Sequence, residues 1–433
     1  MTDPTILQNA TPPELEQAVA YNHKELFRQE AIALGGDMLT NDGLDWTTGT
    51  AYSASMIAFP DLSAATAGIM LDELLSFYLL HPPRGAGCWS LDPSRPADLG
   101  VRLLARGFQP GWRPHWMALD LHDTQTHHPS PKGLEIVANN GISLAAVRNL
   151  PYAQVVVPLV SSAAFPGQWV RFVASLHGRV VAHSVVFLTT GEWGVAGIYH
   201  VGVVPRARHK GIGKAITLAA CVYAREKGYR YAVLNSTEAG KRTYGQLGFS
   251  AVGDGLTWWL IIDRLLARPP TPAEVRLAEA IGQGDLQELS AIRSSNREGF
   301  GDLYGPEGLN RPLTNGMTLM QLAVHCRQPL AAEWLLEGGA TCSALDAWDL
   351  QWKDRARQVL RSAPGQINQF YGEGNKTLLH IAAERNDEEL ALLALSANPD
   401  LRLKDKTWQS TALDWAKHFG HLNIARLIGQ HRK

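Results

Sequence analysis

A glycine-rich turn between an apolar strand and a helix is the part of this chain best suited to chemistry. The expected strand over 196–204 stops at Pro205, and Arg208-His209-Lys210-Gly211-Ile212-Gly213 then leads into a long helical stretch. A helix N-terminus offers free N–H groups and a positive dipole end, and both favour phosphate. Gly211 and Gly213 let the backbone approach such a group closely. The pattern predicts a pyrophosphate cradle built from the N–H groups of His209 to Lys214, with charge added by Arg208, Lys210 and Lys214.

Further polar groups follow this turn within one compact stretch. Asn235 ends the next expected strand, and Tyr244 precedes Leu247-Gly248-Phe249. Together with the R-x-x-G-x-G pattern of Arg208, Gly211 and Gly213, these residues resemble the GCN5-related N-acetyltransferase family over residues 134–262. The resemblance implies a mixed α/β fold and acetyl-CoA as cosubstrate.

The same resemblance implies a role for each of these residues. Backbone groups of Val201 to Val203 would hold the pantetheine arm, and the amide of Val201 or Val203 would polarise the thioester carbonyl, where negative charge develops. Asn235 fits a contact to the pantetheine amides, or simply caps its strand. Tyr244 is the candidate general acid, because a phenol with a pKa near ~10 can donate to a thiolate whose thiol pKa is near ~8.5. Its alternative is a packed aromatic.

The group that would take the proton of the attacking amine is less well specified. Relatives often carry a Glu near the start of this strand, but Gly197 stands here. His200 is the candidate general base because its ordinary pKa lies near neutrality, although a single strand histidine is more often a core residue. Glu192, Glu238 or a chain of waters remain alternatives.

The chain is expected to contain three domains. A polar stretch over 123–132 and the run Arg268-Pro269-Pro270 separate ranges 1–125, 132–263 and 272–433. In the second range, alternation of strands and helices predicts a hairpin of 170–176 with 180–189, a helix over 214–227, a strand over 231–235, a helix over 241–247 and a strand over 258–262. Two capping boxes with Pro at the first helical position predict helices beginning after Thr11 and Thr271.

The first range resembles a degenerate copy of the same fold. Residues 89–91, 96–106 and Gly107-Phe108 mirror the last strand, helix and Gly-Phe of the second copy. No R-x-x-G-x-G turn lies between Ser55 and Gly87, and Leu103 stands where the second copy has Tyr244. This half is expected to be structural or to form a wall of the substrate cleft. An unrelated α/β extension is the alternative.

The third range resembles an ankyrin array. Short helix pairs are expected, and the runs that begin at Thr318, Thr377 and Thr411 echo one another. The last two begin 34 residues apart, close to the ankyrin period of about 33. A trimmed repeat is expected over 346–360, and a helical bundle without ankyrin geometry is the alternative. The resemblance implies a protein partner or self-association.

Composition narrows the functional class. The net charge is −1, which argues against generic nucleic-acid or membrane-surface binding because both require a concentrated basic face. Four scattered cysteines without metal-site spacing indicate reduced thiols and no metal. With no secretory signal and no long apolar run, a cytoplasmic protein is expected.

The leading functional hypothesis is an acetyl-CoA-dependent N-acetyltransferase acting on a primary amine of a small molecule. The first half would shape the acceptor pocket, and the ankyrin repeats would mediate interaction or oligomerisation. Two alternatives stay open: a protein N-acetyltransferase whose substrate docks on the repeats, and a non-catalytic adaptor that senses acetyl-CoA.

Overall fold

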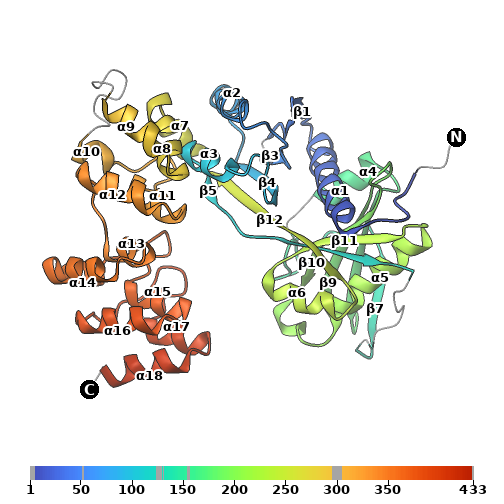
Figure 1. The fold of residues 1–433 in the computed structure, drawn as a ribbon. Coiled ribbons are helices and arrows are strands. Elements are labelled where there is room, and N and C mark those ends of the chain that lie inside the picture. The colour runs from blue at the N-terminus through green and yellow to red at the C-terminus, as the bar shows by residue number, and fades with distance from the viewer. Residues whose placement is uncertain are drawn as a thin grey trace. The chain divides into compact units, whose positions relative to one another are not determined.

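The computed structural model describes residues 5–50, 53–122, 129, 131–153, 157–294 and 305–431. Most of the stretch expected as a linker over 123–132 lies outside these residues, as do Arg432 and Lys433 at the chain end. The chain divides into two compact units, Met1–Pro270 and Thr271–Lys433. The first is a mixed α/β structure and the second is helical (Figure 1).

The first unit is built on one sheet, which has twelve strands within the described residues. Their spatial order is β1-β2-β3-β4-β12-β6-β11-β10-β9-β8-β7, with β5 paired to β12. The strands are β1 (Met38–Asn41), β2 (Leu44–Thr47), β3 (Ser55–Ala58), β4 (Ala86–Asp92), β5 (Gln109–Pro110), β6 (His115–Asp120), β7 (Leu134–Ala138), β8 (Trp169–Leu176), β9 (Arg179–Leu188), β10 (Ala196–Val203), β11 (Tyr231–Ser236) and β12 (Ser250–Leu260).

The two halves of this unit exchange their last strands. β6 comes from the first half but lies between β11 and β12 of the second half. β12 pairs first with β6, through Ser250 to Asp254, and then with β4, through Asp254 to Leu260. The expected ranges 1–125 and 132–263 therefore do not form two separate compact units, because each half completes the sheet of the other.

Helices cover both faces of the sheet. α1 (Pro12–Ala33) packs against β10, β12 and α4 (Val157–Ala164), whereas α5 (Ile212–Glu226) packs against β8, β9 and β10. Side chains alternate between the two faces along a strand. In β11, Val233 accordingly joins the core beneath α1, and Leu234 joins the core beneath α5. α2 (Ala67–Leu80), α3 (Leu99–Ala105) and α7 (Ile262–Ala267) enclose a third core over the first half.

Most of the expected elements of the second half are confirmed. The hairpin is formed by β8 and β9, and the helix that begins after Gly211 is α5. The helix that follows β11 and the last strand depart most from expectation, because they begin three and eight residues early. α6 (Glu238–Gly245) starts after Thr237, whose hydroxyl caps it by accepting from the Gly240 N–H at 3.2 Å. β12 starts at Ser250 because its first residues pair with β6.

The second unit consists of helix pairs joined by turns. The pairs are α8 (Pro272–Gln283) with α9 (Leu286–Ser294), α11 (Leu319–His325) with α12 (Pro329–Glu337), α13 (Ala344–Asp349) with α14 (Lys353–Ser362), α15 (Leu378–Arg385) with α16 (Glu388–Ser396), and α17 (Ala412–His418) with α18 (Leu422–His431); α10 (Pro306–Leu309) is a single turn. A capping box opens α11, α13, α15 and α17. The helix pair in the region of the expected trimmed repeat begins after Ser343, 34 residues before Thr377.

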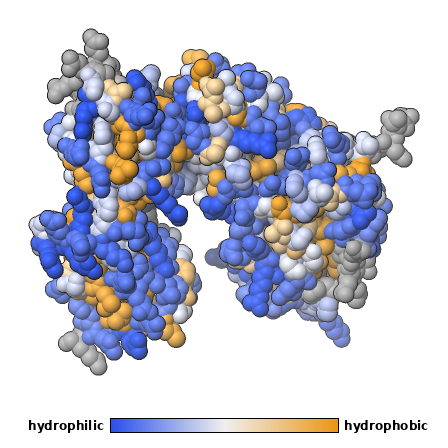
Figure 2. All heavy atoms as spheres, in the orientation of Figure 1, coloured by the Kyte–Doolittle hydropathy of each residue, from blue (hydrophilic) through white to orange (hydrophobic). Residues whose placement is uncertain are grey.

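Apolar and hydrophilic residues both reach the surface, in alternating patches (Figure 2). Among the helices of the described residues, none combines the length and the apolar character needed to cross a bilayer.

Candidate acetyl-transfer site

Two neighbouring parallel strands separate at the centre of the candidate site. β10 and β11 are paired only at Ala196 with Ala232 and at Gly197 with Val233. On its other side, β10 pairs with β9 through a register shift between Tyr199 and Gly202. A bulge of this kind bends the strand. Beyond Gly197, β10 therefore has no pairing with β11 within the described residues, and the Val203 carbonyl accepts from the Arg208 side chain.

The predicted phosphate cradle follows β10 directly. A 3-10 turn (Pro205–Ala207) leads to Gly211, which has a φ of 78° and is the residue before α5. The Ala215 N–H bonds the Gly211 carbonyl at 3.0 Å, so the N–H groups of Ile212 to Lys214 precede the helical hydrogen bonds. Ile212 itself is buried and can contribute only its backbone. This donor set fits a pyrophosphate group.

The charged side chains around the cradle differ in their placement. Arg208, His209 and Lys210 are exposed beside it, and the Arg208 Nε donates to the Val203 carbonyl at 3.3 Å. The Lys214 ammonium instead donates to the side-chain carbonyl of Gln246. Without a ligand, the Lys214 side chain is thus directed at the end of α6.

Tyr244 lies on α6 and is half-buried. Its ring contacts Phe249 edge to face, with centroids 5.9 Å apart. Burial, and secondarily the nearby Tyr152, raise the pKa of Tyr244 to about 12. Its hydroxyl therefore stays protonated at neutral pH and can act as a hydrogen-bond donor.

His200 lies at the bulge of β10, where its φ is 51°. Its ring is 5.4 Å from that of Tyr152, and its buried Nδ1 has no hydrogen-bond partner among the described residues. Burial, together with the neighbouring His183, lowers the pKa of His200 to about 4. The imidazole is consequently neutral at physiological pH and able to accept a proton. His183 is anchored separately, by its Nε2 2.7 Å from the Pro151 carbonyl.

Helix α1 of the first half occupies the space beside Gly197. A Cβ at this position would lie 2.0 Å from the Asn22 Oδ1 and 2.4 Å from the Tyr199 ring. Asn22 is fixed there, because its Oδ1 accepts from the Tyr199 hydroxyl at 2.6 Å and its Nδ2 donates to the Val195 carbonyl at 3.2 Å. A Glu cannot replace Gly197 while α1 is in this place.

The next residue of α1, His23, lies close to Asn235, the side chain expected to contact the cofactor. The Nδ1 of His23 lies 3.5 Å from the Asn235 Nδ2. The His23 ring is buried among aromatic side chains, with centroids 4.6 Å from Trp89 and 5.3 Å from Tyr199. Burial, and secondarily His200, lower the pKa of His23 to about 3. The first half thus supplies side chains next to the site.

The structure brings together most of the predicted side chains. Tyr152 adjoins both His200 and Tyr244, and His23 adjoins Asn235. Sequence reasoning missed four neighbours of the site, which are Asn22, His23, Tyr152 and His183. For the residues of α1, Gly197 is the sequence feature that indicates a neighbour, because a glycine in a strand interior marks a close approach by another part of the chain. Of the alternative bases, Glu192 is exposed, and Glu238 is 2.8 Å from the His115 Nε2.

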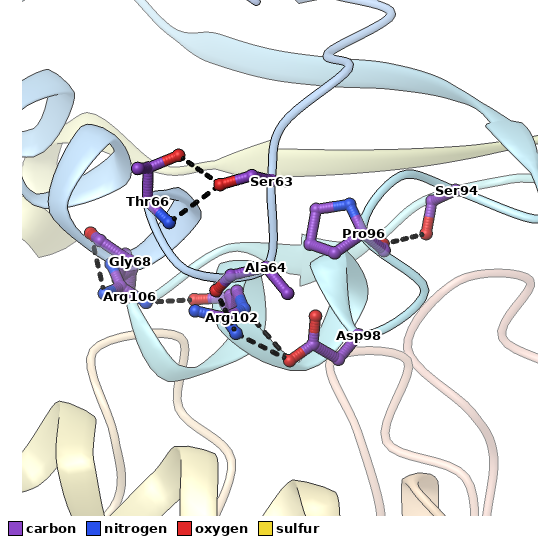
Figure 3. Close-up of polar contacts among 9 residues, drawn as sticks. All are labelled: Ser63, Ala64, Thr66, Gly68, Ser94, Pro96, Asp98, Arg102 and Arg106. Carbon is purple, nitrogen blue, oxygen red and sulfur yellow. Dashed lines mark hydrogen bonds and ion pairs between the residues drawn. The ribbon is translucent and has the colours of Figure 1, made fainter.

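The corresponding turn of the first half is filled by arginine side chains (Figure 3). It leads from β3, which is parallel to β4, into α2. Arg102 donates to the Ala64 carbonyl and Arg106 to the Gly68 carbonyl, each at 3.1 Å. Leu103, at the position of Tyr244, is fully buried. These contacts give a physical reason why this half offers no second cradle.

Comparison with known proteins finds one family model that matches part of the second half. Residues 154–249 match the model of the acetyltransferase (GNAT) family. No curated protein matches the chain. Similar solved structures include GCN5-related N-acetyltransferases from Kribbella flavida (16% identity, 56% of this chain and 95% of that chain, TM-score 0.45) and Sphaerobacter thermophilus (16%, 59% and 95%, 0.39), and a tandem GNAT protein from the clavulanic acid biosynthesis pathway (13%, 60% and 99%, 0.40). The family match carries the assignment of a GNAT acetyltransferase domain, and this family uses acetyl-CoA.

Proposed function

We propose that the first unit transfers an acetyl group from acetyl-CoA to a primary amine of a small molecule. The observation that supports this most strongly is the junction at Gly211. There the open N-terminus of α5 follows a strand that has parted from its neighbour after Gly197. The cradle would hold the pyrophosphate, and the free edge of β10 would hold the pantetheine arm.

In the proposed reaction, the amine nitrogen attacks the thioester carbonyl carbon and the carbon–sulfur bond breaks. The amide of Val201 or Val203 stabilises the oxyanion. Tyr244 donates its proton to the departing thiolate, and His200 takes the proton that the amine loses. Asn235 orients the pantetheine amides. Proton exchange with solvent then restores Tyr244 and His200.

The role of Tyr244 is tested by measuring CoA release with a panel of primary amines. We expect Tyr244→Phe to lower kcat by about 10²-fold or more, the usual contribution of general acid–base catalysis. Tyr223→Phe, a tyrosine of α5 whose ring packs on Phe172, is the matched control and should keep its turnover. Unchanged turnover in Tyr244→Phe would remove this residue as the acid.

The acceptor class is a separate question, because a helical repeat unit can also dock a protein substrate. Removal of residues 272–433 distinguishes the two cases. Retained acetylation of free amines supports the small-molecule proposal. Activity lost only towards a protein substrate supports docking on the repeats.

A sensor of acetyl-CoA is the second candidate function, and Gly197 favours it. α1 fills the place of the usual acidic base, and the low pKa of His200 makes this histidine a weak base. Tight binding of acetyl-CoA without turnover on any amine would support the sensor. We further propose a cytoplasmic location and an interaction or self-association role for an ankyrin-type second unit.

A further inference from the structure

A groove runs between helices α14 and α16 of the second unit. It encloses about 830 Å³, and Leu360 and Trp348 are the buried residues at its base. Its remaining lining comes from α14, from α16 and from the turns that follow them; these residues are Lys353, Arg357, Arg361, Pro364, Glu389, Leu392, Leu393, Ser396, Ala397 and Asn398.

One wall of the groove is basic. Lys353, Arg357 and Arg361 are spaced four residues apart on α14, so they form a single stripe along the helix. The rise of an α-helix places successive members about 6 Å apart and gives the stripe a length of about 12 Å. This stripe therefore presents three positive charges at regular spacing.

The acidic neighbours of this stripe lie at its solvent-exposed rim. Lys353 pairs with Glu389, and Arg357 pairs with Asp354 at 2.7 Å. The side chains of the two acids are 69% and 99% exposed. Exposed pairs of this kind contribute about 0–1 kcal/mol, so an incoming carboxylate can replace them. Arg361 has no ion pair with any residue that the structure describes.

The opposite wall has an apolar centre, flanked by Glu389 at one end and by Ser396 and Asn398 at the other. Leu392 is 53% exposed although it is a large aliphatic side chain, and Leu393 and Ala397 lie partly buried beside it. In Figure 2, strongly hydrophilic residues cover the area of α14, and apolar residues gather near them over α16. A surface with one basic and one apolar wall complements a chain that carries carboxylates on one side and apolar groups on the other.

We propose that this groove binds an acidic amphipathic segment of another protein. Its carboxylates, repeating every ~6 Å as at positions i, i+4 and i+8 of a helix, would pair with Lys353, Arg357 and Arg361. Its apolar side chains would cover Leu392 and Leu393. A nucleic acid fits less well, because it offers no apolar face for the second wall and would meet Glu389 at the rim.

The proposal is tested by selecting from a random peptide library on the full-length protein. Enriched peptides should combine regularly spaced Asp or Glu with Leu-type residues. Their affinities are then measured by fluorescence anisotropy with four proteins: the wild type, Arg357→Glu/Arg361→Glu, Leu392→Asp and the control Lys417→Glu/Arg426→Glu, which changes the same charge on α17 and α18.

We expect the Kd to rise about tenfold or more in Arg357→Glu/Arg361→Glu and also in Leu392→Asp. A tenfold rise corresponds to a loss of about 1.4 kcal/mol of binding free energy. The control should bind as the wild type does, and added salt should weaken binding. The proposal is overturned if the selected peptides are not enriched in acidic amphipathic sequences. It is also overturned if the peptides bind Arg357→Glu/Arg361→Glu as tightly as they bind the wild type. A labelled oligonucleotide whose binding needs Arg357 and Arg361 but not Leu392 overturns it as well. Amine acetylation should be unchanged in every variant, which separates this test from that of the proposed function.

Discussion

Three ionisable side chains of the candidate site have pKa values shifted by burial so that each is neutral at neutral pH. Tyr244 has a pKa raised to about 12, whereas His200 and His23 have pKa values lowered to about 4 and about 3. At neutral pH the phenol is thus always a donor and both imidazoles are always potential acceptors. The burial of the two histidines also makes the folded state sensitive to acid.

The contribution of His23 to this acid sensitivity can be measured as a pH dependence of the free energy of unfolding. Its pKa is about 3 in the folded state and near ~6.5 in an unfolded chain. Between these values the unfolded state binds the additional proton, so the free energy of unfolding falls as the pH falls. The stability that His23 contributes is present above about pH 6.5 and is lost towards pH 3. We expect the stability difference between the wild type and His23→Gln to change by about 1.4 kcal/mol per pH unit in this window.

Denaturant unfolding of both proteins at a series of pH values measures this difference. His421→Gln is a suitable control, because the His421 ring lies in the second unit, with its Nδ1 2.7 Å from the Ala383 carbonyl. A stability difference that stays constant with pH would mean that His23 is accessible to protons in the folded protein.

Gly197 and Asn22 lie so close together that a side chain at position 197 would clash with Asn22. Gly197→Ala should destabilise the protein by about 1–3 kcal/mol, because its Cβ would lie 2.0 Å from the Asn22 Oδ1. In an Asn22→Ala background the same change should cost less, since the clash with the amide is gone. A double-mutant cycle of unfolding free energies measures this coupling. Additive effects would contradict the close contact between α1 and β10.

At the scale of elements, the sequence predicted the hairpin, the turn and the helix around the expected cradle because their signals are local. Gly211 ends a turn and begins a helix, and the hairpin of β8 and β9 is bounded by His177-Gly178-Arg179. The insertion of α1 beside Gly197 depends on residues more than a hundred positions away. Gly197 indicates a close approach but not which residues make it, so His23 and Asn22 were not predicted. The hydrogen bond of Lys214 to Gln246 was not predicted either.

The two glycines of the cradle should respond differently to alanine. Gly211 has a φ of 78°, and an alanine there costs roughly 1–2 kcal/mol. An alanine at Gly213 would lie 3.7 Å from Val203, an ordinary contact, and should leave the stability unchanged or slightly higher. Because its methyl group would face the pyrophosphate, we expect Gly213→Ala to weaken CoA binding nonetheless. Thermal unfolding and calorimetric titration with CoA measure the two effects. Unchanged CoA affinity in Gly213→Ala would place the phosphates elsewhere.

At the scale of the whole molecule, the strand exchange makes the first unit a single cooperative structure. β6 pairs with β11 from Asp120 with Tyr231 to His115 with Ser236. A fragment of residues 132–270 would lose β6 and expose the edges of β11 and β12, which favours aggregation. We expect residues 1–270 to be soluble and cooperatively folded, and the shorter fragment to aggregate or remain unfolded. Size-exclusion chromatography and circular dichroism compare them, and a stable, folded fragment 132–270 would contradict the exchange.

The most direct test of the central claim is mass spectrometry of the full-length protein with acetyl-CoA and a panel of primary amines. The measurement quantifies the acetylated amine and free CoA in the same reaction. The proposed function predicts an acetylated amine formed in equal amount to CoA, with the yield strongly reduced in Tyr244→Phe. Acetyl-CoA that binds but yields no acetylated amine, or CoA that is released without amine acetylation, would contradict it.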